Sequence, residues 1–152
     1  MRSVIVEWFE TKISYEKVDE EGLSRKVTEK YVVDAVNYTE AEERITAEMM
    51  QRISTEFNVK GISIAPYSEI IFSDNEIDEH WFKAKVKFYS VNERNGRKKI
   101  LTTCYLVQAY DIEGAVFRMN KSLNGTVVDY AICSVADAGL TDVFEYTKKE
   151  NE

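Results

Sequence analysis

Similarity between the two halves of the chain is the feature that most constrains its fold. Trp8-Phe9 returns as Trp81-Phe82, 73 positions later, and the segment 31–35 returns as 105–109, 74 positions later. A further set matches Ala41, Arg44 and Ile45 with Ala115, Arg118 and Met119. Another matches Ser63-Ile64-Ala65 with Ser134-Val135-Ala136 at spacing 71, and Phe72 with Phe144 at spacing 72. Recurrence at a nearly constant spacing indicates a repeated structural unit, so the sequence predicts that a module of about 70 residues was duplicated in tandem.

Each copy is predicted to begin with a strand that is buried on one face. Alternate positions along 9–15 and 82–88 are apolar or small, which is the period of a half-buried strand. The residues on the predicted core face are Phe9, Thr11, Ile13 and Tyr15 in the first copy and Phe82, Ala84, Val86 and Phe88 in the second. After a polar turn, a second strand is expected at about 27–36 and at about 99–110.

A helix and two further strands complete each predicted copy. Asn37 and Asp111 are predicted N-caps, because their side chains can accept hydrogen bonds from the first free N–H groups of a helix. Glu40 stands three residues after Asn37, at the spacing of a capping box. The third strands are expected at about 59–66 and 127–136, and the short fourth strands at about 69–73 and 140–146.

The predicted fold class is α+β, with two ββαββ copies in tandem, mostly antiparallel sheet, two helices and a pseudo-twofold relation between the copies. The copies are expected at about 4–73 and 81–146, joined by an acidic linker at 74–80, within a single compact domain that spans 1–152. One copy would bury too small a core to be stable, so the copies are expected to pack together. Two arrangements remain open: the sheets join edge to edge, or the two helices share one core.

Composition and charge exclude several classes of protein. The chain carries 20 Lys and Arg against 27 Asp and Glu, a net charge of −7 at pH 7, which argues against a surface that binds nucleic acid or lipid over its whole extent. No apolar run approaches the roughly 20 residues that span a bilayer, and the first residues lack a signal-peptide pattern, so we expect a cytoplasmic protein with no membrane partner.

Cys104 and Cys133 lie in apolar runs and are expected to be small buried residues.

The sequence contains no recognisable catalytic or metal-binding motif. His80 is the one histidine, which excludes sites built from several histidines, and the six glycines lack the spacing of a phosphate-binding loop. We therefore expect no catalytic residue, no metal and no cofactor. An enzyme that uses carboxylates alone, such as Asp137 with Asp142, is the remaining enzymatic alternative.

A row of basic residues in the second copy is the strongest candidate for a binding site. Its members are Lys83, Lys85 and Lys87 on the non-core face of a strand, and Arg97, Lys98 and Lys99 in the adjoining hairpin. The strand lysines recur at intervals of about 6.6–7 Å, with Trp81 at the head of the row. Charge beside an aromatic ring favours a phosphate-bearing ligand or a single strand of nucleic acid. The alternative is a solvated face whose lysines discourage aggregation.

Trp8 and Trp81 have two interpretations. Both fall on the polar face at the start of a first strand. They either cover the edge of the sheet or form partner-facing aromatic hot spots.

The order of Trp-Phe, an alternating strand, YVVDA, NYTEAEERI and finally DVFEY at 142–146 resembles an uncharacterised domain family. That family is associated with Bacteroidetes genomes and their phages or mobile elements, and the resemblance covers about 7–146. It implies a small intracellular accessory protein and assigns no activity, cofactor or catalytic residue to any position.

Together these observations favour a non-enzymatic binding or interaction protein of a phage or mobile element, acting as a homo-oligomer or with a protein partner. A protein that binds or sequesters a small anionic ligand, such as a nucleotide, is the first alternative. An accessory protein that binds single-stranded nucleic acid is a less favoured one.

Overall fold

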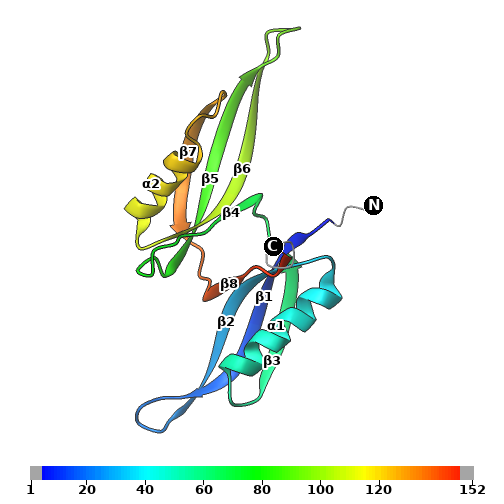
Figure 1. The fold of residues 1–152 in the computed structure, drawn as a ribbon, viewed down its shortest axis with the longest axis vertical. Helices are drawn as coiled ribbons and strands as arrows, with labels where there is room; N and C mark the ends of the chain where they lie inside the picture. The colour runs from blue at the N-terminus through cyan, green and yellow to red at the C-terminus, as the bar shows by residue number, and fades with distance from the viewer. Residues whose placement is uncertain (1–4, 148–152) are drawn as a thin grey trace. The chain divides into compact units, whose positions relative to one another are not determined.

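The computed structural model describes residues 5–147 and has an α+β fold with two helices and two mostly antiparallel four-stranded sheets (Figure 1). The elements of the first half are β1 (Glu7–Val18), β2 (Ser24–Ala35), α1 (Tyr38–Arg52), β3 (Phe57–Ile64) and β4 (Glu69–Ile71). Those of the second half are β5 (His80–Val91), β6 (Lys98–Ala109), α2 (Ile112–Ser122), β7 (Asp129–Asp137) and β8 (Asp142–Phe144). The order ββαββ therefore occurs twice along the chain.

The contacts divide the described chain into two compact units whose limits differ from the expected copy boundaries. The first unit holds the described residues up to Ala65 together with those from Leu140 onward, and the second holds Pro66–Gly139. Strand β4 therefore belongs to the sheet of the second unit, and β8 to that of the first. The strand orders are β3-β1-β2-β8 and β4-β6-β5-β7.

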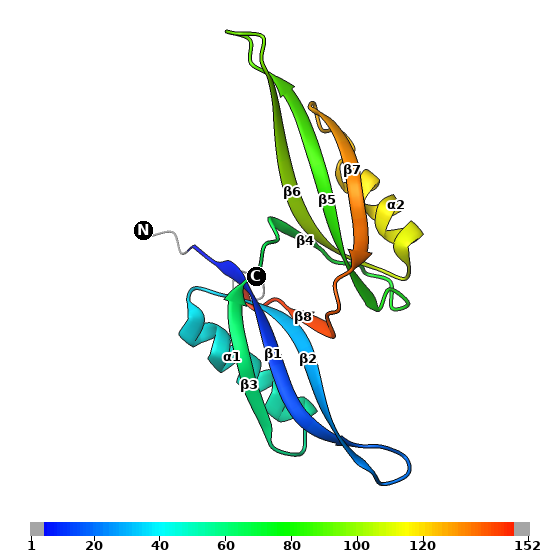
Figure 2. The same ribbon diagram turned by 180° about the vertical axis from the view of Figure 1, so that it is seen from behind.

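In the first unit, α1 covers one face of the sheet, as the opposite view shows with the strands in front (Figure 2). The alternation of β1 causes this burial, because Phe9 and Ile13 point to the helix side and are at most 2% exposed. Ala41, Ile45 and Met49 recur at every fourth position of α1 and are fully buried against them. In the second unit the corresponding core joins Phe82, Ala84 and Val86 of β5 to Ala115 and Met119 of α2.

Both predicted helix caps are confirmed. The Asn37 side chain accepts a hydrogen bond from the N–H of Glu40, at 2.8 Å, and Asp111 accepts one from Gly114, at 2.7 Å. The Glu40 carboxylate in turn accepts the N–H of Val36, one residue before the cap, at 3.1 Å.

The strand registers correct two of the matches between the halves. Ile64 lies opposite Phe9, and Asp137 lies opposite Phe82. Corresponding positions of the third strands are therefore 73 apart, so the match of 63–65 with 134–136 is wrong by two residues. In the parallel fourth strands Phe144 pairs with Val33 and Ile71 with Val107, so Phe144 corresponds to Ile71 and not to Phe72. Small residues and turns of similar composition produce these misalignments, which only the hydrogen-bonded register resolves.

In each unit, a side chain near the end of one long strand (β2 or β6) accepts hydrogen bonds from the segment that follows the short parallel strand of the same sheet (β8 or β4). In the first unit the buried Asp34 carboxylate accepts the N–H groups of Tyr146, at 2.7 Å, and Thr147, at 2.9 Å. In the second unit the Gln108 amide oxygen accepts the N–H of Ser73, at 2.9 Å. Arg44 from α1 lies 3.5 Å from the Asp34 carboxylate, so its charge offsets the burial of that carboxylate.

Asp34→Asn is expected to lower the free energy of unfolding by about 1.5–3 kcal/mol, because one oxygen that accepts a backbone N–H is replaced by an NH₂ group. Urea unfolding measures the change. Asp142→Asn is the matched control, because Asp142 and its ion-pair partner Arg52 are exposed by 36% and 42%, and its loss should cost about 0–1 kcal/mol. Equal losses in the two variants would contradict the role of Asp34.

Candidate functional site

The three strand lysines lie on the face of the second sheet that is opposite α2. Strand β5 is an inner strand, between β6 and β7. Its alternate residues Phe82, Ala84 and Val86 fill the core with α2, so alternation directs Lys83, Lys85 and Lys87 outward. Lys85 and Lys87 are exposed and Lys83 is half-buried. The predicted placement of this row on the non-core face is therefore what the structure shows.

The neighbours of Lys85 and Lys87 on this face are small or short, whereas Lys83 lies opposite Leu106, which is fully buried. Lys85 lies opposite Cys104 of β6 and Ser134 of β7, and Lys87 lies opposite Thr102 and Ala131. Such side chains are too short to cover a lysine ammonium. Lys85 and Lys87 therefore stand above a low surface that is open to a ligand.

No carboxylate neutralises the row within residues 5–147, where none of the three lysines forms an ion pair. The Lys83 ammonium instead lies 5.9 Å from the centre of the Tyr67 ring, a cation–π contact. Burial raises the pKa of the Cys104 thiol, while the positive charges of Lys83 and Lys85 oppose that rise. The three lysines thus carry positive charge that no ion pair neutralises, on a chain of net charge −7, and Asp129 lies opposite Tyr89 at one end of the same face.

The structure brings only part of the hairpin cluster to this face. Arg97, Lys98 and Lys99 are all exposed. Lys98 pairs with Val91 and shares the side of Lys87, whereas Lys99 pairs with Ser90 and points to the opposite side by alternation. The hairpin extends past β7, so Lys98 lengthens the row at one end (Figure 1).

The two tryptophans occupy different environments. Trp81 is 3% exposed and makes an edge contact with Phe72, with ring centres 5.6 Å apart, so it offers no open ring face to a partner. Trp8 is half-buried. The aromatic ring exposed on the lysine row is Tyr89, at 41%, two positions beyond Lys87. Extending the same alternation by one step would have identified Tyr89 from the sequence.

The cysteines correct the expectation that both are buried. Cys104 is half-buried on the lysine side of β6, and Cys133 is exposed. Cys133 is the extra residue of a β-bulge, because Lys85 pairs with Ser134 while Val86 pairs with Ile132. The bulge removes Cys133 from the alternation on which the expectation rested.

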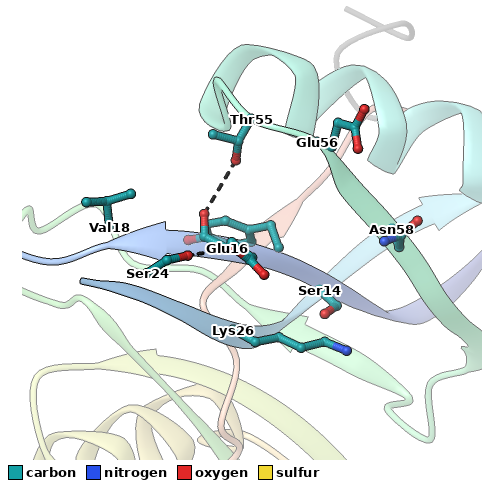
Figure 3. Close-up of a pocket in the computed structure, with 9 residues that line it drawn as sticks. Ser14, Glu16, Val18, Ser24, Lys26, Thr55, Glu56 and Asn58 are labelled. Carbon is teal, nitrogen blue, oxygen red and sulfur yellow. Dashed lines mark hydrogen bonds between the residues drawn. The ribbon is translucent and has the colours of Figure 1, made fainter. Parts of the chain in front are cut away.

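A pocket of about 510 Å³ lies in the first unit, toward the hairpin end of β1 and β2 (Figure 3). Its lining combines hydroxyl, amide, carboxylate and ammonium groups from β1, β2, β3 and the connection before β3. The lining residues are Ser14, Tyr15, Glu16, Val18, Ser24, Lys26, Thr55, Glu56 and Asn58. The Glu16 carboxylate accepts a 2.5 Å hydrogen bond from Ser24, and its backbone carbonyl accepts a 3.5 Å bond from Thr55.

The chemistry of this pocket is hydrogen bonding without an activated nucleophile. None of the residues that line it is a histidine or a cysteine. Among the described residues, no group of three or more His, Cys, Asp or Glu side chains could hold a metal ion. Asp137 and Asp142 belong to different units; Asp137 accepts the N–H of Gly139, and Asp142 is paired with Arg52 at 2.7 Å.

One residue of the expected acidic linker has a structural role that the sequence did not reveal. Asp78 is 7% exposed and accepts hydrogen bonds from Ser73 and from Arg118 of α2. The Ser73 hydrogen bond lowers the pKa of the Asp78 carboxyl, burial opposes this, and Arg118 lowers it further. The segment after β4 is thereby fixed to α2.

Because the folded-state pKa of Asp78 is depressed, its contribution to stability is present above the unfolded-state pKa, about 3.9, and is lost as the pH falls through the folded value. Asp78→Asn is expected to lower the melting temperature at pH 7 and to reduce the further drop between pH 4 and pH 2. Thermal melts at these pH values measure both effects. Asp74→Asn, an exposed position in the same segment, should leave both unchanged. An unaltered acid response in Asp78→Asn would contradict the assignment.

Comparison with known proteins adds a family and no activity. A family model described as a domain of unknown function, DUF4494, matches residues 7–146, which confirms the resemblance to an uncharacterised family. A search of curated proteins found no match. No helix among residues 5–147 is long and apolar enough to cross a membrane.

Proposed function

We propose that this chain, which belongs to the DUF4494 family, is a non-enzymatic binding protein that captures an anionic ligand on the lysine face of its second sheet. The observation that carries the proposal is the row Lys83, Lys85 and Lys87, which no carboxylate neutralises within the described chain. An intracellular setting in a phage or mobile element is part of the same proposal. The unpaired cysteines Cys104 and Cys133 are consistent with a reducing compartment.

The shape of the row favours an extended anion. From Lys83 to Lys87 the strand rises by about 13 Å, and Tyr89 adds a ring at about 20 Å. A linear arrangement of ammonium groups matches several phosphates in succession, and an exposed ring provides a surface on which a base can stack. A small nucleotide would use only one end of the row.

We also propose that the scaffold arose by the tandem duplication of one ββαββ module. In support, β1–β2 and β5–β6 have the same register, with Phe9 opposite Val33 and Phe82 opposite Val107. Each central strand pairs with its third strand across a β-bulge at corresponding positions, after Lys12 and after Lys85. The outer faces differ between the units, so the function is assigned to the second unit and not to both.

The test uses Lys85→Ala/Lys87→Ala, with a labelled single-stranded dT oligonucleotide and with ATP as probes. Removing two phosphate contacts should weaken oligonucleotide binding by about tenfold or more and reduce the slope of log K against log salt by about 1.4. Fluorescence anisotropy over a salt series measures both. Lys17→Ala/Lys121→Ala removes the same charge from exposed positions elsewhere and should bind like the parent protein. Equal weakening in both pairs, or no binding of either probe, would refute the proposal.

Self-association is a second candidate function, favoured by apolar side chains at the end of the β5–β6 hairpin. Val91 and Ile100 are 60% and 57% exposed, and they share the lysine side of the hairpin with Tyr89, which lies opposite Ile100. Exposed apolar groups that gather at one place are typical of protein interfaces.

Val91→Ser/Ile100→Ser is expected to convert an oligomer to a monomer, because it removes apolar area from one side of this hairpin end. Light scattering after size exclusion, over a range of concentrations, gives the mass. Val18→Ser/Leu23→Ser, at the corresponding hairpin end of the first unit, is the matched control. A parent protein that is monomeric at every concentration would exclude this candidate.

A further inference from the structure

A second group of lysines surrounds a hollow on the outer face of the first sheet. The hollow has a volume of about 420 Å³ and lies wholly within the first unit. Lys12 reaches it from β1, Lys30 from β2 and Lys60 from β3. Three ammonium groups from three adjacent strands therefore border one space, unlike the linear row of the second sheet.

A β-bulge makes this convergence possible. Lys12 pairs with Gly61, whereas the next residue, Ile13, pairs with Val59, so Lys60 is the extra residue of the bulge. Val59 points to the helix side and packs in the core. The bulge allows Lys60 and Gly61 to lie on the outer side together, next to Lys12.

Glycine at position 61 keeps the floor of the hollow open. It lies directly opposite Lys12, so a side chain at this position would stand next to that of Lys12. A Cβ atom added there would meet no atom within 4 Å, and the backbone is not in the left-handed region. The space is therefore open because glycine has no side chain. The backbone conformation at this position would accept another residue.

The charge of the hollow suits a compact anion with two negative charges. Glu10 also lines it, and its carboxylate lies 3.7 Å from the Lys30 ammonium. Lys12 and Lys60 form no ion pair among residues 5–147. The lining thus carries three positive charges and one negative charge, and Ser63 adds a hydroxyl donor. Lysine binds phosphate as a point charge, so several lysines around one space favour a phosphate group.

We propose that Lys12, Lys30 and Lys60, arranged around Gly61, form a binding site for the phosphate group of a phosphomonoester. This site is separate from the lysine face of the second sheet. The Glu10 carboxylate limits it to one phosphate group, because a second anion beside the first would meet a like charge. At the corresponding bulge, the second unit has Cys133 and Ser134 in place of Lys60 and Gly61, so the site belongs to the first unit alone.

The test measures the binding of phenyl phosphate and of inorganic phosphate to the full chain by isothermal titration calorimetry at fixed ionic strength. Lys12→Ala/Lys60→Ala should raise the Kd for phenyl phosphate about tenfold or more, because two charge-assisted contacts are lost. Gly61→Val keeps every charge and places a branched side chain within the hollow, opposite Lys12, so it should also raise the Kd for phenyl phosphate. Valine suits a strand, so this variant is expected to keep the parent melting temperature. Binding of inorganic phosphate alone would identify the free ion as the ligand and overturn the monoester assignment.

Two controls separate this site from general charge and from the other face. Lys17→Ala, on the same strand β1 but outside the hollow, should bind phenyl phosphate like the parent protein. Lys85→Ala/Lys87→Ala should do so as well, even if it has lost oligonucleotide binding. The proposal is overturned if the parent protein does not bind phenyl phosphate at millimolar concentration. It is also overturned if Lys17→Ala or the Lys85/Lys87 pair weakens binding as much as Gly61→Val does.

Discussion

The alternation of side chains along β1 and β5 is the constraint on which the rest of the structure depends. Each strand lies inside its sheet, and each sheet has one helix, so one face of the strand packs against that helix, while Lys12, Lys85 and Lys87 on the other face are exposed. Burying Phe9 and Ile13, or Phe82 and Val86, fixes the register of the strand and thereby directs every other residue outward. The lysines are exposed because their neighbours in the sequence are needed in the core.

The two β-bulges then give the outer faces different chemistry. Each bulge lies between the central strand and the third strand, at a corresponding position of the two sheets. In the first sheet the extra residue is Lys60, beside Gly61, and the result is a hollow bordered by lysines. In the second sheet the extra residue is Cys133, beside Ser134, and the lysines remain a straight row. A similar backbone therefore supports two arrangements of charge, one compact and one extended.

Polar contacts at the ends of the second strands fix the short parallel strands. Strands β4 and β8 have three residues each, which is too few for ladder hydrogen bonds alone to hold them firmly. Asp34 and Gln108 supply acceptors for the backbone that follows, and Asp78 connects that backbone to α2 in the second unit. Two of these acceptors are carboxylates that pair with an arginine, Asp34 with Arg44 and Asp78 with Arg118. The two arginines stand at the same position along α1 and α2, so each helix holds one carboxylate.

The sequence by itself determined the α+β class, the order of strands and helices, both helix caps and the outward direction of the lysines. Each follows from local chemistry: period-two alternation, a side-chain acceptor at the start of a helix, and residues that tolerate a turn. Only the tertiary structure decided which sheet the short fourth strands join, where the bulges fall and which acidic residue is buried. Those outcomes depend on hydrogen bonds between segments far apart in the chain, as in the bonds from Tyr146 to Asp34 and from Arg118 to Asp78, and no local pattern encodes them. Lys60 became a neighbour of Lys12 and Lys30 for the same reason, because a bulge is defined by the partner strand as much as by its own residues.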